Sequence, residues 1–600
     1  MQTSQFLIHY QVNLTSTTGH LFNVSLTIDK PNPQGQTLSL PAWIPGSYMV
    51  RDFAKNIIWL KALDDSRKEL TVKKLDKQSW LVSPSDGPIH IEYQIYAFDL
   101  SVRGAYINDE IAFLNGTNAF LAVAGQTQQP IKITLKKPSD TKLAHWKVAT
   151  TLTTSPNNIH EFGEYSANNY DELIDHPVLM GEFDTISFKA QDVEFELVLA
   201  GGHQADTKRI ASDLTKICDH QLSFFDGPAP VSRYLFITLL TDNAFGGLEH
   251  ISSTALMYSR KDLPSLSDKH SMTDGYQVFL SLCSHELFHT WHIKRTKPIE
   301  LFNASLDAEK YTEQLWIYEG FTSYYDDLSL LKTGLITQEA YLKVIAQNLT
   351  RLLRNKGRFK QSITDSSFDA WIKFYKQDEG SINHIVSYYN KGAIVALCLD
   401  LLIRRESKYT LSLDNVLQEL WTQYGQVNIP TAPQCVHQII EHKLGLNLSE
   451  FLNLALYSTQ ELPTIELLSQ FGVTADQFSR SSLQDKGGER NTTPFAIDFG
   501  AMAKPLDIGI QLTQVTEHSA AYQAGLQVGD VLIAIGRWQI SMDNLKAQLN
   551  NLALGQSVTL TILRDKKLKE LEFIAQVAAI DTIALSIADQ SLCDLWLANN

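Results

Sequence analysis

The sequence has few cysteines and no long apolar run. Five cysteines are scattered over 600 residues, and no two of them form a CxxC pair. This arrangement excludes a disulfide framework and a cysteine-ligated zinc site, and it predicts reduced thiols in a cytoplasmic protein. The longest strongly apolar stretch, residues 393–403, contains Asp400. It is much shorter than the roughly 20 residues that span a bilayer, so we expect no membrane partner.

Positive charge and low-complexity sequence are also scarce. Asp and Glu total 66 against 51 Lys and Arg, which gives a net charge of −15. Such a chain repels nucleic-acid phosphates, so we expect no nucleic-acid partner. Hydrophobic residues make up 44% and charged residues 20%, as in ordinary globular proteins. Residues 1–10 lack the basic and apolar regions of a secretory signal, and their pattern predicts a β-strand.

The chain is too long for one hydrophobic core, since domains usually have about 100–200 residues. Residues 1–185 alternate apolar and polar side chains at period two, which predicts a mostly antiparallel, sandwich-like β domain. Residues 186–478 are mostly helical by their apolar spacing, and 494–577 contain alternating strands after a polar linker. Residues 578–600 remain as a tail. The predicted fold class is therefore multidomain α+β, with helices expected at 273–294, 311–332, 338–355, 388–405 and 432–442.

Two histidines four residues apart indicate a metal site. His285 and His289 enclose Glu286 in the pattern HExxH, and on a helix this spacing brings both imidazoles to one ion. Glu286 then faces the open side of that ion. The apolar flanks predict a buried helix, in which unpartnered histidines would be costly. We expect one zinc ion per chain.

A catalytic zinc ion needs a third protein ligand. His292 shares the helical face of His285, but seven helical residues span about 10.5 Å, too far for one ion. Glu319 is the only charged residue of the apolar segment 314–325, and a lone buried glutamate needs a compensating cation. Glu319 is therefore the predicted ligand. Other glutamates have more polar surroundings and are weaker candidates, namely Glu300, Glu309 and Glu313.

An acidic residue outside the ligand set is a candidate for orienting a histidine. Asp326 follows Glu319 by seven residues and so lies on the same helical face. Ligand histidines commonly hydrogen-bond a carboxylate that orients the ring. Asp326, or Asp327 instead, is the candidate for this role, and a solvated aspartate is the alternative.

These segments resemble those of a known peptidase family. The resemblance to the glycyl aminopeptidases, the M61 family of zinc peptidases, lies in residues 285–295 (HELFHTWHIKR) and 315–325 (LWIYEGFTSYY). The family's N-terminal domain is similar at residues 43–48 (WIPGSY), and residues 494–577 resemble a PDZ domain. The resemblance implies a thermolysin-like catalytic domain at 186–478. It also implies removal of N-terminal residues, preferentially glycine and alanine, from peptides with a free N-terminus.

A second resemblance is to the related M1 aminopeptidases. Their Gly-x-Met-Glu-Asn motif is similar to Gly246-Gly247-Leu-Glu249-His250. It implies that Glu249 binds the substrate α-ammonium through a charge-assisted hydrogen bond. Gly246 and Gly247 would let the substrate backbone lie along a flat strand edge.

A third segment implies an oxyanion donor. Residues 388–392 (YYNKG) resemble the run that supplies a phenol to the M1 active site. The match implies that Tyr389, rather than Tyr388, donates a hydrogen bond to the developing oxyanion, with a buried structural tyrosine as the alternative. Glu286 would act as general base and then return the proton to the leaving amine.

Two loops have open roles. The turn-rich residues 41–51 are expected to pack on their own sheet, although they could reach a neighbouring site. Residues 508–510 (IGI) resemble the carboxylate-binding loop that opens the first strand of a PDZ domain. Such a domain docks peptide C-termini by β-augmentation, and a purely packing role is the alternative. A zinc endopeptidase and a catalytically silent PDZ-bearing scaffold are the competing functions.

Overall fold

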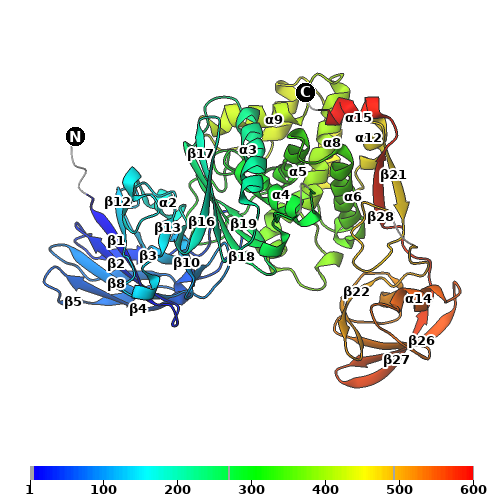
Figure 1. Cartoon of the computed structure of the whole chain (residues 1–600), viewed down its shortest axis with the longest axis horizontal. Helices are drawn as coiled ribbons and strands as arrows, with labels where there is room; N and C mark the ends of the chain where they lie inside the picture. The colour runs from blue at the N-terminus through cyan, green and yellow to red at the C-terminus, as the bar shows by residue number, and fades with distance from the viewer. Residues whose placement is uncertain (1–5, 268–270, 491–492, 599–600) are drawn as a thin grey trace. The chain divides into compact units, whose positions relative to one another are not determined.

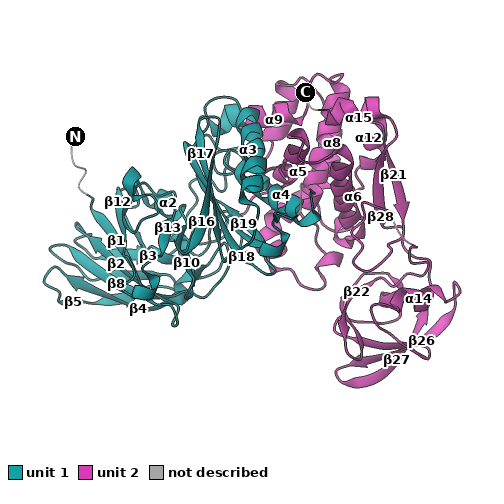
Figure 2. Ribbon diagram, viewed as in Figure 1, with its two compact units in different colours: residues 1–310, 421–431 teal, residues 311–420, 432–600 magenta. Residues whose placement is uncertain are grey.

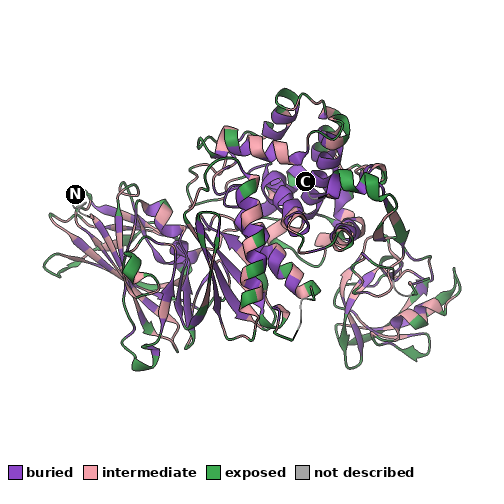
Figure 3. Ribbon diagram, turned by 45° about the horizontal axis from the view of Figure 1, so that its top comes forward, coloured by how far each residue is buried: buried purple, intermediate pink, exposed green. Residues whose placement is uncertain are grey.

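We describe a computed structural model of the chain, in which residues 6–267, 271–490 and 493–598 are placed (Figure 1). The chain folds into two units, unit 1 with residues 1–310 and 421–431, and unit 2 with residues 311–420 and 432–600 (Figure 2). Buried residues, purple in Figure 3, make up much of the strands and helices. Within the placed ranges, no helix is both long and apolar enough to cross a membrane.

Unit 1 begins with β-sheets, as the period-two pattern predicts. In β1 buried and half-buried residues alternate, because one face of the sheet packs on the core. β1 pairs in parallel with β12 and antiparallel with β2. The strand predicted from residue 1 begins at Ile8, and residues 1–5 lie outside the described part. The order of this sheet is β14 (Gly163–Ala167), β12 (Ile131–Leu135), β1 (Ile8–Ser16), β2 (Leu21–Ile28), β8 (Ile89–Tyr96), β4 (Ile57–Asp64) and β5 (Glu69–Leu70).

Smaller sheets complete the N-terminal region. One follows the order β13 (Lys147–Ala149), β15 (Val178–Gly181), β10 (Ile111–Leu114) and β9 (Ala105–Ile107). Another follows β11 (Ala122–Val123), β3 (Gln36–Ser39), β7 (Ser79–Val82) and β6 (Val72–Lys74). The short helices α1 (Gly116–Ala119) and α2 (Tyr170–Ile174) pack against each other here.

A mixed sheet continues unit 1 beyond residue 182. Its order is β16 (Phe183–Ala190), β17 (Val193–Ala200), β18 (Arg233–Thr241), β20 (Ser253–Ser259) and β19 (Phe245–Glu249). The helix α3 (Thr207–Phe224) joins β17 to β18, and α4 (Asp274–Phe288) packs beside β19 and β20. Residues of β17, β18 and β20 share one apolar core with the N-terminal sheets. Unit 1 is therefore continuous through this sheet, and β19 lies at its edge.

Helices dominate the first part of unit 2. The helices are α5 (Thr322–Lys332), α6 (Gln338–Arg354), α7 (Ile363–Phe368), α8 (Asn390–Glu406), α9 (Leu413–Leu420), α10 (Cys435–His442), α11 (Ser449–Tyr457) and α12 (Thr464–Gln470). The predicted helices at 338–355, 388–405 and 432–442 correspond to α6, α8 and α10.

Two predicted helices differ from the structure. The helix predicted at 273–294 ends at Phe288, because the chain turns directly after the second histidine. The segment predicted at 311–332 starts as a π-helix, η5 (Trp316–Phe321), and only then becomes α5. The predicted α+β architecture of several regions is confirmed, whereas these local geometries are corrected.

The C-terminal sheet follows the order β22 (Ala501–Leu506), β23 (Gly509–Val515), β24 (Val531–Ile535), β26 (Ser557–Arg564) and β27 (Lys567–Ile574), and β25 (Trp538–Gln539) pairs with β24. The helices α13 (Ala520–Gln523) and α14 (Leu545–Asn550) accompany it. Residues 508–510 do not open the first strand, which corrects that prediction. Ile508 lies in the turn between β22 and β23, and Gly509 and Ile510 open β23, the second strand. A Cβ on Gly509 would lie only 2.2 Å from the Leu532 carbonyl oxygen.

The last described residues form a strand and a helix. β28 (Thr582–Ile587) pairs antiparallel with β21 (Val473–Phe478), so the two segments that flank the C-terminal sheet meet. The final helix, α15 (Gln590–Leu597), buries Trp596, whose Nε1 donates to the Tyr324 hydroxyl at 3.1 Å. The chain therefore returns to the helical part of unit 2 after the C-terminal sheet; residues 599–600 of the predicted tail lie outside the described part.

Candidate active site

The helix α4 presents the histidine pair at its C-terminal end. Thr273 caps its first turn by accepting a hydrogen bond from the Tyr276 amide. His289 is the C-cap residue, and its Nδ1 lies 2.9 Å from the backbone carbonyl of His292. That bond leaves the His289 Nε2 available as a metal ligand. Among the described residues, His292 is not part of the donor group formed with His285 and His289, and it lies beyond the end of α4 at Phe288.

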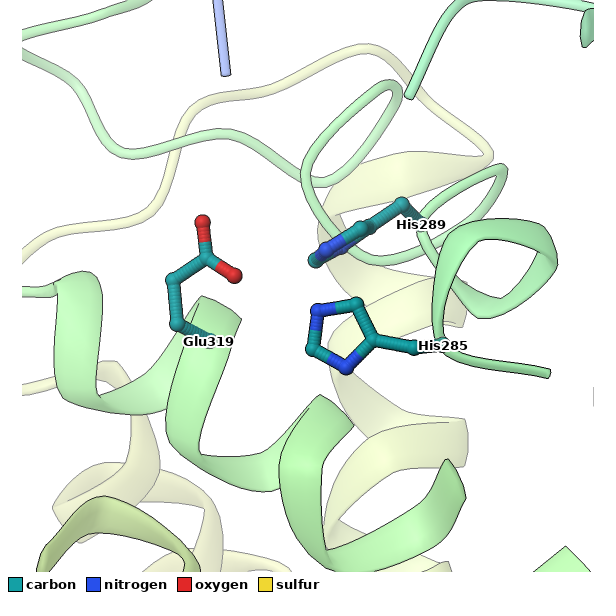
Figure 4. A group of neighbouring side chains, drawn as sticks. All are labelled: His285, His289 and Glu319. Atoms are coloured by element: carbon teal, nitrogen blue, oxygen red, sulfur yellow. The ribbon is translucent and has the colours of Figure 1, made fainter. Parts of the chain in front are cut away.

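His285, His289 and Glu319 form a compact donor set. One ligand atom from each residue lies within 4.8 Å of the others. Figure 4 shows both imidazoles and the carboxylate facing a common space. Glu319 is only 1% exposed, so its charge has little access to water. Two imidazole nitrogens and a carboxylate oxygen are ligands typical of a catalytic zinc site, and these residues fit that ion.

Glu286 lies beside the edge strand rather than in solvent. Glu286 is 5% exposed. Thr254 Oγ1 donates to the Leu248 carbonyl at 3.0 Å and also lies 3.4 Å from the Glu286 Oε2. A Cβ on Gly247 would lie 1.9 Å from the Glu286 Oε1, so only glycine fits at that position. Thr254 was not recognised from the sequence, because a buried threonine in a strand carries no motif.

Glu249 meets the N-terminal region of unit 1. A Cβ on Gly46 would lie 2.5 Å from the Glu249 Oε1, and Gly46 has φ +87°, which also favours glycine. In the same loop, Trp43 Nε1 donates to the Ala308 carbonyl at 3.0 Å. Residues 41–51 therefore reach the edge strand β19 of the mixed sheet instead of packing only on their own sheet, which corrects the favoured expectation.

A cleft of about 1470 Å³ in unit 1 extends beside Glu249 and the Gly46 loop. Asp175 on its wall accepts hydrogen bonds from Lys294 Nζ at 2.9 Å and His250 Nδ1 at 3.1 Å. Although burial opposes ionisation, these two partners hold the pKa of Asp175 below its usual range. Burial lowers the pKa of nearby Lys297 to about 8, and Lys294 adds to that effect. The cleft is thus strongly polar on the side that contains Lys294.

Tyr389 stands directly before α8, within a group of aromatic rings. Its ring centroid lies 4.8 Å from that of Tyr388 and 5.5 Å from that of Phe374, both in stacked geometry. Its hydroxyl hydrogen-bonds Tyr375. Burial raises the pKa of Tyr389 well above its usual value, and the Glu319 carboxylate contributes to the shift. Tyr389 is therefore neutral and can donate a hydrogen bond near Glu319.

Other site predictions have less structural support. Tyr388 is fully buried, as the structural alternative for that pair requires. Asp326 is half-buried on α5, where its Oδ1 accepts a hydrogen bond from the Asp327 amide at 2.6 Å. The role of Asp326 in orienting a histidine stays a prediction. Tyr375 was missed, since no local sequence signal relates it to Tyr389.

Comparison with known proteins places the chain in a family. The model of the Peptidase M61 N-terminal domain matches residues 9–182, and that of the M61 glycyl aminopeptidase matches 278–395. The crystal structure of an aminopeptidase N family protein from Idiomarina loihiensis is 43% identical, with a TM-score of 0.95, over 98% of this chain and 100% of that one. The chain belongs to the M61 glycyl aminopeptidase family. It is thus a peptidase, and its family belongs to the metallo-aminopeptidases.

Two other similarities are more distant or partial. The PDZ domain model matches residues 491–574 of this M61 member. The structure of an M1 zinc metallopeptidase from Deinococcus radiodurans is 13% identical, with a TM-score of 0.47, over 76% of this chain and 94% of that one. A probable periplasmic serine protease (do/HhoA-like) of Haemophilus influenzae is 32% identical over 114 residues, which are 19% of this chain and 23% of that relative. The chain therefore spans less than a quarter of that curated relative.

Proposed function

We propose that this protein is a zinc-dependent aminopeptidase that hydrolyses the first peptide bond of peptides with a free N-terminus and prefers glycine and alanine there. The observation that carries the proposal is the donor set of His285, His289 and Glu319, with ligand atoms within 4.8 Å. It is supported by Glu286, which the HExxH spacing places next to those histidines. Family membership supports the preference for small residues.

Substrate recognition is assigned to Glu249 and the glycine edge. The Glu249 carboxylate would accept a charge-assisted hydrogen bond from the substrate α-ammonium, which confines cleavage to the first peptide bond. Gly46 lacks a side chain that would displace this carboxylate. Gly246 and Gly247 leave the edge of β19 open for the substrate backbone.

Catalysis is assigned to Glu286 and Tyr389. Glu286 accepts a proton from the attacking water and then gives a proton to the leaving amine. Thr254 Oγ1, at 3.4 Å, is a polar neighbour of this carboxylate. The neutral Tyr389 hydroxyl donates to the oxyanion that forms on the scissile carbonyl. A zinc ion, when bound, supplies Lewis acidity that polarises the carbonyl and acidifies water.

The experiment compares an alanyl peptide with its N-acetylated form, before and after chelation and zinc restoration. An aminopeptidase cleaves only the free form, because the acetyl group removes the charge that Glu249 binds. Equal cleavage of both forms would instead favour the endopeptidase alternative. Rates on the p-nitroanilides of Gly, Ala and Leu test the preference, and fastest cleavage of the Leu compound contradicts it.

A binding role for the PDZ domain is a second proposal. The strand β22 lies at the end of its sheet and, within the placed residues, pairs only with β23, so a peptide strand could add to it. Fluorescence polarisation with a library of labelled C-terminal peptides and the full chain tests this. Uniform absence of binding favours a packing role for the domain.

A further inference from the structure

The loop that carries Arg103 is held in one conformation. The Asn115 side-chain amide donates to the Val102 carbonyl at 2.9 Å and to the Gly104 carbonyl at 3.2 Å. The Asn118 amide donates to the Arg103 carbonyl at 3.0 Å. Both asparagines are buried, so three consecutive carbonyls of the loop are bound by internal amides. The backbone of Arg103 is therefore fixed before any ligand arrives.

The Arg103 side chain lies at the predicted substrate edge. Its Nη2 donates to the Gly247 carbonyl on β19 at 3.4 Å. Gly247 is the residue whose Cβ would strike the Glu286 carboxylate, so the guanidinium contacts the strand residue that covers the general base. The neighbouring Val102 approaches Gly246, whose Cβ would lie 3.9 Å from the Val102 Cγ2. This N-terminal loop thus contacts Gly247 and approaches Gly246.

Within the part of the chain that the structure describes, the guanidinium has no counter-ion. Among the described residues, no carboxylate forms an ion pair with Arg103, and its Nε is buried without a hydrogen-bond partner. Asp99, the nearest acidic residue in sequence, is exposed and forms no ion pair with it. A partly buried cation without a partner is unfavourable, and the planar guanidinium fits a carboxylate through two parallel hydrogen bonds. A carboxylate is therefore the ligand chemistry that suits this position.

If the proposed function holds, the distance between Gly247 and Glu249 along β19 indicates that this carboxylate is the C-terminus of a short peptide substrate. Gly247 and Glu249 are two residues apart on β19, which corresponds to about 6.6 Å at 3.3 Å per residue. An extended peptide beside this strand has the same rise. With its α-ammonium at Glu249, its terminal carboxylate reaches the Gly247 region after two residues, or after three within the length of an arginine side chain.

We propose that Arg103 binds the terminal α-carboxylate of short substrates, so that the enzyme acts on dipeptides and tripeptides lying along β19. Arg103 is then a specificity residue on the leaving-group side. Glu249 and Arg103 together select peptides by length, because one binds the α-ammonium and the other binds the α-carboxylate.

The test compares Ala-Ala and Ala-Ala-Ala with their C-terminal amides. For the wild-type protein we expect kcat/KM to favour the free acids about 10- to 100-fold, as a hydrogen-bonded charge pair would give. Arg103→Ala should abolish this preference, mainly by raising KM for the acids, and should change rates on the amides and on Ala p-nitroanilide less than about threefold. Arg103→Lys should restore part of the preference, since it keeps the charge without the planar fork.

The matched control is Arg67→Ala, because Arg67 is exposed in the same region and pairs with Glu92 at 3.5 Å. It should leave every substrate unchanged. Equal losses on acids and amides in Arg103→Ala, or no preference in the wild type, overturn the proposal. Failure of the proposed function is distinguishable, because the wild type would then not cleave Ala p-nitroanilide. Binding of Ala-Ala and its amide to Glu286→Gln, with and without Arg103→Ala, gives a readout independent of turnover.

Discussion

The two segments that carry the predicted metal ligands are built differently. The helix α4 is regular and capped, and its two histidines are one turn apart. Glu319 lies in η5, a π-helix without a side-chain cap that passes directly into α5. π-helical turns are rare and are often found at functional sites. The comparison teaches that spacing along the chain suffices to align the histidines, whereas a packing contact decides where the glutamate lies.

That contact is between two glycines. A Cβ on Gly320 would lie 2.6 Å from the Gly392 Cα, and a Cβ on Gly392 would lie 2.8 Å from the Gly320 Cα. The backbones of η5 and α8 therefore touch. Because α8 begins next to Tyr389, the same contact relates the predicted oxyanion donor to the predicted ligand Glu319.

The largest loss of activity is expected for Glu286→Gln on α4. This variant should remove the proposed general base and leave the proposed metal ligands in place. Activity on Ala p-nitroanilide should fall at least about 10³-fold, since the amide cannot accept the proton. Metal content, measured by atomic absorption, should stay at the wild-type level because His285 and His289 are unchanged. His289→Ala is the control that should lose both. Near-normal turnover in Glu286→Gln would contradict the assigned role.

On the η5 side, Tyr389→Phe should lower kcat about 10²- to 10³-fold with little change in KM, as for loss of one oxyanion donor. Tyr388→Phe is the matched control, because the neighbouring tyrosine is buried. Steady-state kinetics of both variants decide the choice between them. A larger loss of kcat in Tyr388→Phe would reverse the assignment.

Gly320→Ala tests the contact that distinguishes η5 from α4. The added methyl must displace α8, which should cost about 1–3 kcal/mol of stability and weaken zinc binding about 10- to 100-fold. Thermal unfolding and competition with a chelator measure the two effects. Ser281→Ala, on half-buried Ser281 of α4, should leave both unchanged. Unaltered zinc affinity in Gly320→Ala would mean that Glu319 does not depend on this packing.

The smallest effect is expected for Tyr375→Phe. Loss of its hydrogen bond to Tyr389 should lower kcat about 2- to 10-fold at constant KM. In a Tyr389→Phe background the same change should have no further effect, because the two residues act as one unit. Additive losses in the double variant would assign Tyr375 an independent role.

The C-terminal region offers a further contrast between pattern and packing. Alternating strands were predicted within residues 494–577, and β23 and β24 are among the strands found there, since alternation is a local property. Its attachment was not predicted. Asn383 donates to the Val515 carbonyl at 2.9 Å and accepts from the Glu517 amide at 2.8 Å. These contacts join residues 132 and 134 positions apart, and no spacing rule relates them.

The regular helices and strands and the types of the metal ligands could be predicted from the local sequence pattern, because helical and strand periods place side chains on known faces. The amino acids at 285, 286, 289 and 319 carried enough chemistry to suggest a metal and a base. The irregular parts did not follow, because they depend on close approach between distant backbones. Gly46 against Glu249, Gly320 against Gly392 and Arg103 against Gly247 are such approaches. Folding brings these residues together through contacts between distant parts of the chain. Such contacts follow no sequence periodicity, and for that reason the sequence pattern does not predict them.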